Sequence, residues 1–199
     1  MNLLTDDTKY YTKPDPPVII RLLLNKDFQK KFPKYHSELL NKGVDVNRRD
    51  YDGQTPLIIA SKWGRTNVVK LLLDHPHIDV NQNINGLTAL MYASTNGHAD
   101  VVELLLAKED VDVNRVDTKG ETALMSASKR GHADVVELLL AHPQIDVNRG
   151  DRNEYTALMW AVQEGHLDVV ARLLAHKGVD VNQGRATDGL TALMMASAR

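Results

Sequence analysis

A short motif recurs along this chain at nearly constant intervals. Thr-X-Leu appears five times, with its threonines spaced by 33, 34, 34 and 35 residues, and Asp-Val-Asn recurs in step with it. A period of this size indicates a stack of small units, each of which buries its apolar face only against its neighbours. The motifs begin at Thr55, Thr88, Thr122, Thr156 and Thr191, and at Asp45, Asp79, Asp112, Asp146 and Asp180.

Within one period, residues 117–148, the residue order predicts a turn followed by two antiparallel helices. Thr122 is placed to cap the first helix with its hydroxyl, and Gly131 is placed to end that helix. The spacing of Asp134-Val135-Val136-Glu137 matches a capping box, which predicts a second helix over 135–141. This second helix is too apolar on all sides for a lone surface helix, so the neighbouring repeats must cover it.

This unit of β-turn, helix and helix, with Thr-X-Leu and Asp-Val-Asn in fixed order, resembles the ankyrin repeat. The resemblance takes in about residues 35–199 and implies an all-α ankyrin-repeat solenoid of about five to six repeats, including degenerate or partial ends. The predicted divisions are an extended tail (1–17), a degenerate N-terminal capping repeat (18–47), four repeats (48–81, 82–114, 115–148 and 149–182) and a partial C-terminal repeat (183–199).

Two departures from the ankyrin pattern lead to predictions. Glu154 occupies the glycine place of the fourth turn. Either Glu154 adopts positive φ, at a cost of about 1 kcal/mol, or Asn153 takes that conformation and the tip is reshaped; we expect the reshaped tip. Ankyrin repeats also usually carry His after Thr-Pro-Leu, and here flexible apolar packing is expected instead. That position holds Ile58, Met91, Met125, Met159 and Met194.

The histidines recur at equivalent positions, which indicates a repeated structural role in loop hydrogen bonding and at helix C-termini. The chain has no cysteine, no Gly-rich phosphate loop and no Gly-X-Ser-X-Gly motif. We therefore predict no catalytic, cofactor-binding or metal site. The asparagine of each Asp-Val-Asn is likewise expected to hold its turn by side-chain hydrogen bonds. The recurring histidines are His75, His98, His132, His142, His166 and His176.

The charge pattern disfavours nucleic acid and membranes as partners. The formal net charge is −2, and the segment 82–114 alone carries −4. Basic residues flank Trp63, a pattern that can bind single strands, but the acidic segment separates them from Lys129 and Arg130. No apolar run is long enough to span a bilayer, and the N-terminus lacks the features of a secretion signal. A cytoplasmic location is the default prediction, with the nucleus as the alternative.

In ankyrin-like stacks, partners usually touch the turn tips and the exposed side of the inner helices. The variable residues at those positions are therefore the candidate contacts, and aromatic residues stand out because they are frequent binding hot spots. Tyr51 and Trp63 are expected to lie near the rim and to contact the partner. For Tyr92 and Trp160, partner contact and packing between the inner helices are equally expected. The candidates are Tyr51, Asp52, Gln54, Lys62, Trp63, Ile84, Leu87, Tyr92, Asn96, Lys129, Arg130, Arg152, Tyr155, Trp160 and Glu164.

Two of these candidates are apolar residues at a turn tip. We expect Ile84 and Leu87 to be exposed at this tip. Exposed apolar residues often mark interaction sites, so both are candidates for partner binding.

These patterns predict a non-catalytic module that binds a protein partner through its concave face and turn tips, without a cofactor. Two alternatives stay open: a targeting domain of a larger enzyme or effector that continues beyond Arg199, or a structural spacer without its own ligand. Arg199 follows only the first helix of the last repeat. We expect further repeats or another domain beyond it, the alternative being self-association or a partner contact at this apolar end.

Overall fold

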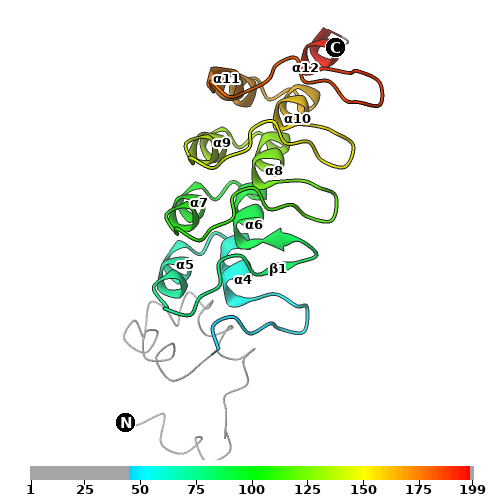
Figure 1. Cartoon of the computed structure of the whole chain (residues 1–199). Helices are drawn as coiled ribbons and strands as arrows, with labels where there is room; N and C mark the ends of the chain where they lie inside the picture. The colour runs from blue at the N-terminus through cyan, green and yellow to red at the C-terminus, as the bar shows by residue number, and fades with distance from the viewer. Residues whose placement is uncertain (1–44, 198–199) are drawn as a thin grey trace, which may run out of the picture.

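The computed structural model describes residues 45–197, and the predicted tail (1–17) and almost all of the predicted capping repeat (18–47) lie outside this range. The helices form two columns that run side by side along the stack (Figure 1). The inner column contains α4 (Pro56–Lys62), α6 (Ala89–Thr95), α8 (Ala123–Arg130), α10 (Ala157–Glu164) and α12 (Ala192–Ser197). The outer column contains α5 (Thr66–Leu73), α7 (Ala99–Leu106), α9 (Ala133–Leu140) and α11 (Leu167–Ala175).

Within each column, successive helices pack against one another, and α4, α6, α8 and α10 each also pack against the outer helix that follows. The turns between repeats project from the inner column on the side away from the outer helices (Figure 1). We call the surface made by the inner helices and these turn tips the inner face. This mostly helical stack agrees with the predicted solenoid.

The inner helices begin where the sequence predicts. The Thr122 hydroxyl accepts a hydrogen bond from the Met125 N–H at 3.2 Å, and Gly131 ends α8 with φ of 76°. The same threonine cap occurs at the other inner helices. A hydroxyl in this place satisfies one of the N–H groups that a helix leaves without an internal partner.

The predicted start of the outer helix is wrong. Helix α9 begins at Ala133, so Asp134 lies in its first turn, and the N-cap residue His132 makes no side-chain capping bond. The tight connection from the inner helix explains this, because the His132 N–H already donates to Ala127 O at 3.0 Å. Asp134 and Glu137 are therefore not a capping box. Both carboxylates instead form ion pairs with Arg172 on the next outer helix.

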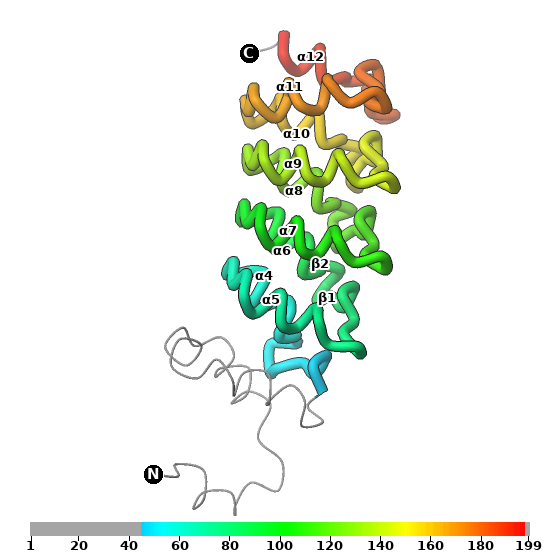
Figure 2. Tube along the Cα trace, turned by 90° about the vertical axis from the view of Figure 1, so that its left-hand side faces the viewer, coloured from blue at the N-terminus to red at the C-terminus, as the bar shows by residue number. Residues whose placement is uncertain are grey.

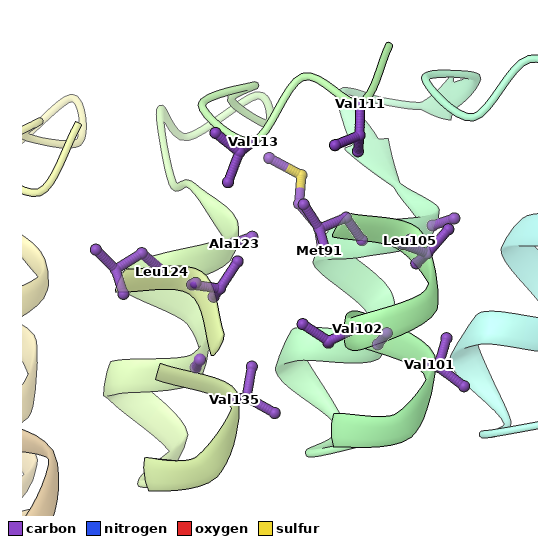
Figure 3. Packing of buried hydrophobic residues seen from close by; sticks show 14 of the residues in the cluster. Met91, Val101, Val102, Leu105, Val111, Val113, Ala123, Leu124 and Val135 are labelled. Carbon is purple, nitrogen blue, oxygen red and sulfur yellow. The ribbon is translucent and has the colours of Figure 1, made fainter. Parts of the chain in front are cut away.

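The predicted apolar packing at the position after Thr-X-Leu is confirmed in the first four copies. Ile58, Met91, Met125 and Met159 are each at most 1% exposed. In Figure 3, Met91 lies in one packed layer with valine and leucine side chains of its own repeat. Met194 differs, with 55% exposure, because no described helix covers α12.

The recurring asparagines tie successive repeats together. Asn114 Nδ2 donates to Gln144 O at 2.6 Å, and Asn114 Oδ1 accepts from the Asp146 N–H at 2.9 Å. Asn47, Asn81 and Asn148 make the same pair of bonds. The prediction of side-chain hydrogen bonds is confirmed, but these bonds form a ladder that joins each repeat to the next in the stack shown in Figure 2.

The recurring histidines make the predicted loop hydrogen bonds. His132 Nε2 lies 3.1 Å from Thr95 O in the preceding repeat, and its ring lies against Gly97. A Cβ at Gly97 would lie 2.7 Å from that ring, so this contact requires glycine. The histidines after the outer helices act locally, as when His142 Nδ1 accepts from the Gln144 N–H at 3.3 Å.

The second turn departs from its neighbours. The strands β1 (Asn83–Ile84) and β2 (Leu87–Thr88) form a small antiparallel hairpin. Its central residues Asn85 and Gly86 have φ of 52° and 84°, as expected of an Asn-Gly hairpin turn.

In the fourth turn, Glu154 itself adopts φ of 63°, so the expectation that Asn153 would take this conformation is wrong. The turn keeps the hydrogen bond of the third turn: Glu154 N donates to Asp151 O at 2.8 Å, as Gly120 N donates to Asp117 O.

The C-terminal end of the stack exposes apolar side chains, as expected. Val147 is 6% exposed, whereas Val181 at the equivalent position is 44% exposed. Leu193 is 75% exposed, although its counterpart Leu158 is only 5% exposed.

Candidate functional site

The candidate residues fall into three groups along the inner face. The first group is the tip of the first turn, where Tyr51 is 95% exposed and Asp52 is also exposed. The tip is held from beneath, because Asp50 Oδ1 accepts from the N–H groups of Asp52 at 3.0 Å and Gln54 at 2.8 Å. Tyr51 therefore stands on a fixed turn with its side chain in solvent.

The second group joins α4 to α6. Trp63 caps the C-terminus of α4 and is 62% exposed, whereas Tyr92 is half-buried against the core. Lys62 Nζ lies 5.8 Å from the Trp63 ring centroid and 5.6 Å from the Tyr92 ring centroid, within range of a cation–π interaction with both. Asn96 donates to Tyr92 O at 2.8 Å and is exposed at the end of α6.

The third group is the most tightly connected. The rings of Tyr155 and Trp160 lie 4.8 Å apart, centroid to centroid, and both side chains are half-buried. Lys129 Nζ lies 3.7 Å from the Trp160 ring centroid and 3.3 Å from Glu121 Oε1. Thus α8, α10 and the fourth turn are joined through one aromatic pair.

Asp151 fixes this pair in place. It is 8% exposed, and its Oδ1 accepts from the N–H groups of Asn153 at 2.8 Å and Tyr155 at 3.0 Å. Its Oδ2 accepts from Trp160 Nε1 at 3.2 Å. Sequence reasoning missed Asp151, and no sequence signal distinguishes it, because Asp50 and Asp117 occupy the equivalent positions of other turns.

The fifth turn adds a second cation. Arg185 lies 5.0 Å from the Tyr155 ring centroid and pairs with Asp188 at 2.6 Å. The Leu190 N–H, which donates to Asp188, and the Arg185 guanidinium lower the pKa of the Asp188 carboxyl. Sequence reasoning missed Arg185 as well. The available signal was loop length, since Thr191 follows Asp180 by eleven residues and Thr156 follows Asp146 by ten.

Glu154 connects the fourth and fifth turns. Its Oε2 accepts from the Ala186 N–H at 2.5 Å, a bond between two turn tips that a glycine here would lack. The bond offsets part of the cost of the positive φ.

The third group borders two open hollows on the inner face. One, of 570 Å³, is lined by the fourth turn, the aromatic pair, Gln163, Arg185 and Thr187. The other, of 360 Å³, is lined by the third and fourth turns together with Lys129 and Trp160. Both hollows share Arg152, which is exposed at the tip of the fourth turn. The structure thus brings Lys129, Arg152, Tyr155 and Trp160 together.

The remaining candidates lie apart from these hollows. Ile84 and Leu87 are half-buried and pack against the core, so the prediction that they are exposed is wrong. The hairpin explains this, because the Ile84 side chain lies against Gly53 of the preceding turn. Arg130 and Glu164 are exposed at the C-terminal ends of α8 and α10.

Within residues 45–197, no group of three or more His, Asp or Glu side chains is arranged to hold a metal ion. In the same range, no helix combines the length and the apolar character needed to cross a membrane.

Comparison with known proteins identifies the repeat. A family model described as "Ankyrin repeats (3 copies)" matches residues 18–117, 109–185 and 146–199. Protein phosphatase 1 regulatory subunit 12A of Mus musculus is 46% identical over 37 residues, and the same subunit of Rattus norvegicus matches equally. These matches cover 19% of this chain and only 4% of the length of either relative.

Proposed function

This chain belongs to the ankyrin-repeat family, and we propose that it is a non-catalytic module that binds a protein partner through its inner face, the concave side of an ankyrin stack. Ankyrin repeats are generally protein–protein interaction modules and are typically non-catalytic. The short match to a phosphatase regulatory subunit covers too little of either protein to suggest a particular partner.

The observation that carries the proposal is the unequal distribution of aromatic side chains. Positions that recur in every repeat are used for caps, ladders and core packing. No aromatic residue is present at the same position in every repeat, and the five described aromatics all belong to turns or inner helices: Tyr51, Trp63, Tyr92, Tyr155 and Trp160. Aromatic residues bury a large area at low entropic cost and dominate many interfaces.

Affinity capture from a host lysate tests the proposal when inner-face and outer-face variants are compared. Trp63→Ala removes an exposed aromatic side chain of the inner face, and Leu167→Ala removes a 78% exposed apolar side chain of the outer column. A partner of this surface is retained by the wild type and by Leu167→Ala and is depleted by Trp63→Ala. Depletion by Leu167→Ala alone would place the binding surface on the outer helices and overturn the proposal.

A further inference from the structure

We infer that the two hollows beside Trp160 bind an acidic, extended peptide segment of the partner, with its carboxylates on Lys119 and Arg152. This inference rests on the proposed function and adds the chemical character of the bound segment. It follows from a comparison of the charged side chains around the hollows, some of which form ion pairs or hydrogen bonds within the protein while others form none with the described residues.

The carboxylates that border the hollows are engaged within the protein. Asp151 accepts three hydrogen bonds, from two backbone N–H groups and the Trp160 indole. Glu121 pairs with Lys129, Asp188 pairs with Arg185, and Glu154 accepts from a backbone N–H. Ion pairs thus neutralise Glu121 and Asp188, whereas Asp151 and Glu154 are held by N–H donors, with Asp151 only 8% exposed and Glu154 half-buried.

Two cations at the rim are not engaged in this way. Lys119 and Arg152 are exposed at the tips of adjacent turns, which are joined by a hydrogen bond from Arg152 N to Lys119 O at 3.0 Å. Neither side chain forms an ion pair with another described residue. Among the residues that line the hollows, the exposed charges without an ion pair are therefore both positive, and they attract carboxylates.

The aromatic pair disfavours a cationic ligand. A ring quadrupole attracts cations, but Lys129 already lies over Trp160 and Arg185 over Tyr155. A further cation, such as a methylated lysine, would meet two positive charges there. The peptide planes and apolar stems of an acidic segment meet no such repulsion.

The shape of the site suits an extended chain. The hollows adjoin across Arg152, Asn153 and Trp160, and they follow three successive turns from Thr118 to Thr187. A peptide of about eight residues, which spans roughly 26 Å when extended, can pass along both of them.

The test uses the Trp63→Phe protein, in which Trp160 is the single tryptophan. The probe is a synthetic peptide of about eight residues that alternates Glu and Gly. Control peptides carry Gln, Lys or phosphoserine in place of Glu. We expect the Glu peptide to change the Trp160 fluorescence saturably, with binding that weakens as the salt concentration rises from about 50 to about 300 mM. We expect no saturable change with the Gln or Lys peptide.

Charge-reversal variants locate the site. Lys119→Glu combined with Arg152→Glu is expected to weaken binding of the Glu peptide by about ten-fold or more. The matched control is Lys70→Glu combined with Lys177→Glu, which changes the net charge equally at exposed positions away from the hollows and is expected to leave binding within about two-fold. Since all four side chains are exposed, both double variants should melt like the parent protein.

The outcomes separate the two proposals. Equal binding of the Glu and Gln peptides, no saturable binding of the Glu peptide, or equal weakening by both double variants would overturn the acidic-segment inference. A phosphoserine peptide that binds more than about ten-fold tighter would reassign the ligand to phosphate and also overturn it. None of these results affects the proposed function, which fails instead if a captured partner is lost only from Leu167→Ala.

Discussion

The asparagine ladder allows a stability prediction with an internal control. Asn114→Ala removes two hydrogen bonds between repeats, one to Gln144 O and one from the Asp146 N–H. A typical intramolecular hydrogen bond contributes about 0.5–1.5 kcal/mol net, and water can partly replace these at a half-exposed side chain. We therefore expect a loss of about 1–2 kcal/mol, and each kcal/mol lowers the melting temperature by about 2–4 °C in a protein of this size.

Asn182→Ala is the matched control. Asn182 ends the same motif, but its side-chain amide makes no hydrogen bond to another described residue, because no later repeat is present within 45–197 to receive it. Its backbone N–H still donates to Asp180 in the variant, just as the Asn114 N–H still donates to Asp112. We expect Asn182→Ala to change the free energy of unfolding by less than about 0.5 kcal/mol.

Urea unfolding followed by far-UV circular dichroism measures the difference between these variants. The dependence of the free energy on urea should be unchanged, because neither variant alters the area exposed on unfolding. Asn114→Asp adds a further comparison: it keeps the acceptor for the Asp146 N–H but replaces the donor with an oxygen that faces Gln144 O. It should destabilise at least as much as Asn114→Ala. Equal stabilities of Asn114→Ala and Asn182→Ala would refute the reasoning, since the ladder would then contribute nothing.

Three further predictions follow from the turns, the core and the inner face. Gly86→Ala should lower the free energy of unfolding in urea by more than about 2 kcal/mol, because a Cβ there combines positive φ with a contact of 2.6 Å to the next turn. Gly189→Ala has only the positive φ and should lower it by about 1 kcal/mol. Ser94→Ala should leave the melting temperature unchanged or raise it, because the buried hydroxyl has no hydrogen-bond partner among the described residues; a clear loss would contradict this. Tyr51→Ala and Trp63→Ala should weaken binding of a captured partner in titration calorimetry while changing the melting temperature little, and a large loss of stability would assign these side chains to the core.

The features that the sequence predicted well are those that repeat. Thr122 caps its helix and His132 bonds the preceding repeat because every copy offers the same local environment. A residue type that returns at a fixed interval therefore shows its role several times over. The predicted start of the outer helix was wrong because a local motif was considered without its surroundings. Asp134 and Glu137 have the spacing of a capping box, but that spacing does not show that the tight turn already satisfies the His132 N–H.

The third group of candidate residues could be predicted only in part. Tyr155, Trp160 and Lys129 were identified because they vary between repeats, but their connection depends on Asp151 and Arg185. Asp151 reaches Trp160 across nine positions in sequence, a contact that no periodic pattern encodes. Differences in loop length could have indicated which turns are unusual. The second turn is one residue shorter than its neighbours and forms a hairpin, and the fifth is one residue longer and carries Arg185.

Glu154 shows how several exceptions to the repeat are connected around the fourth and fifth turns. A non-glycine residue with φ of 63° costs about 1 kcal/mol, and such strain persists only where the surrounding structure compensates for it. Here the compensation is the bond from the Ala186 N–H, which fixes the longer fifth loop against the fourth turn. That loop carries Arg185 to the Tyr155 ring, and the ring in turn lies on Trp160. The strained residue, the extra loop residue and the non-repeating aromatic pair are thus parts of a single contact network around the larger hollow. Because the scaffold folds elsewhere without these features, their concentration here favours a role in recognition over a role in stability.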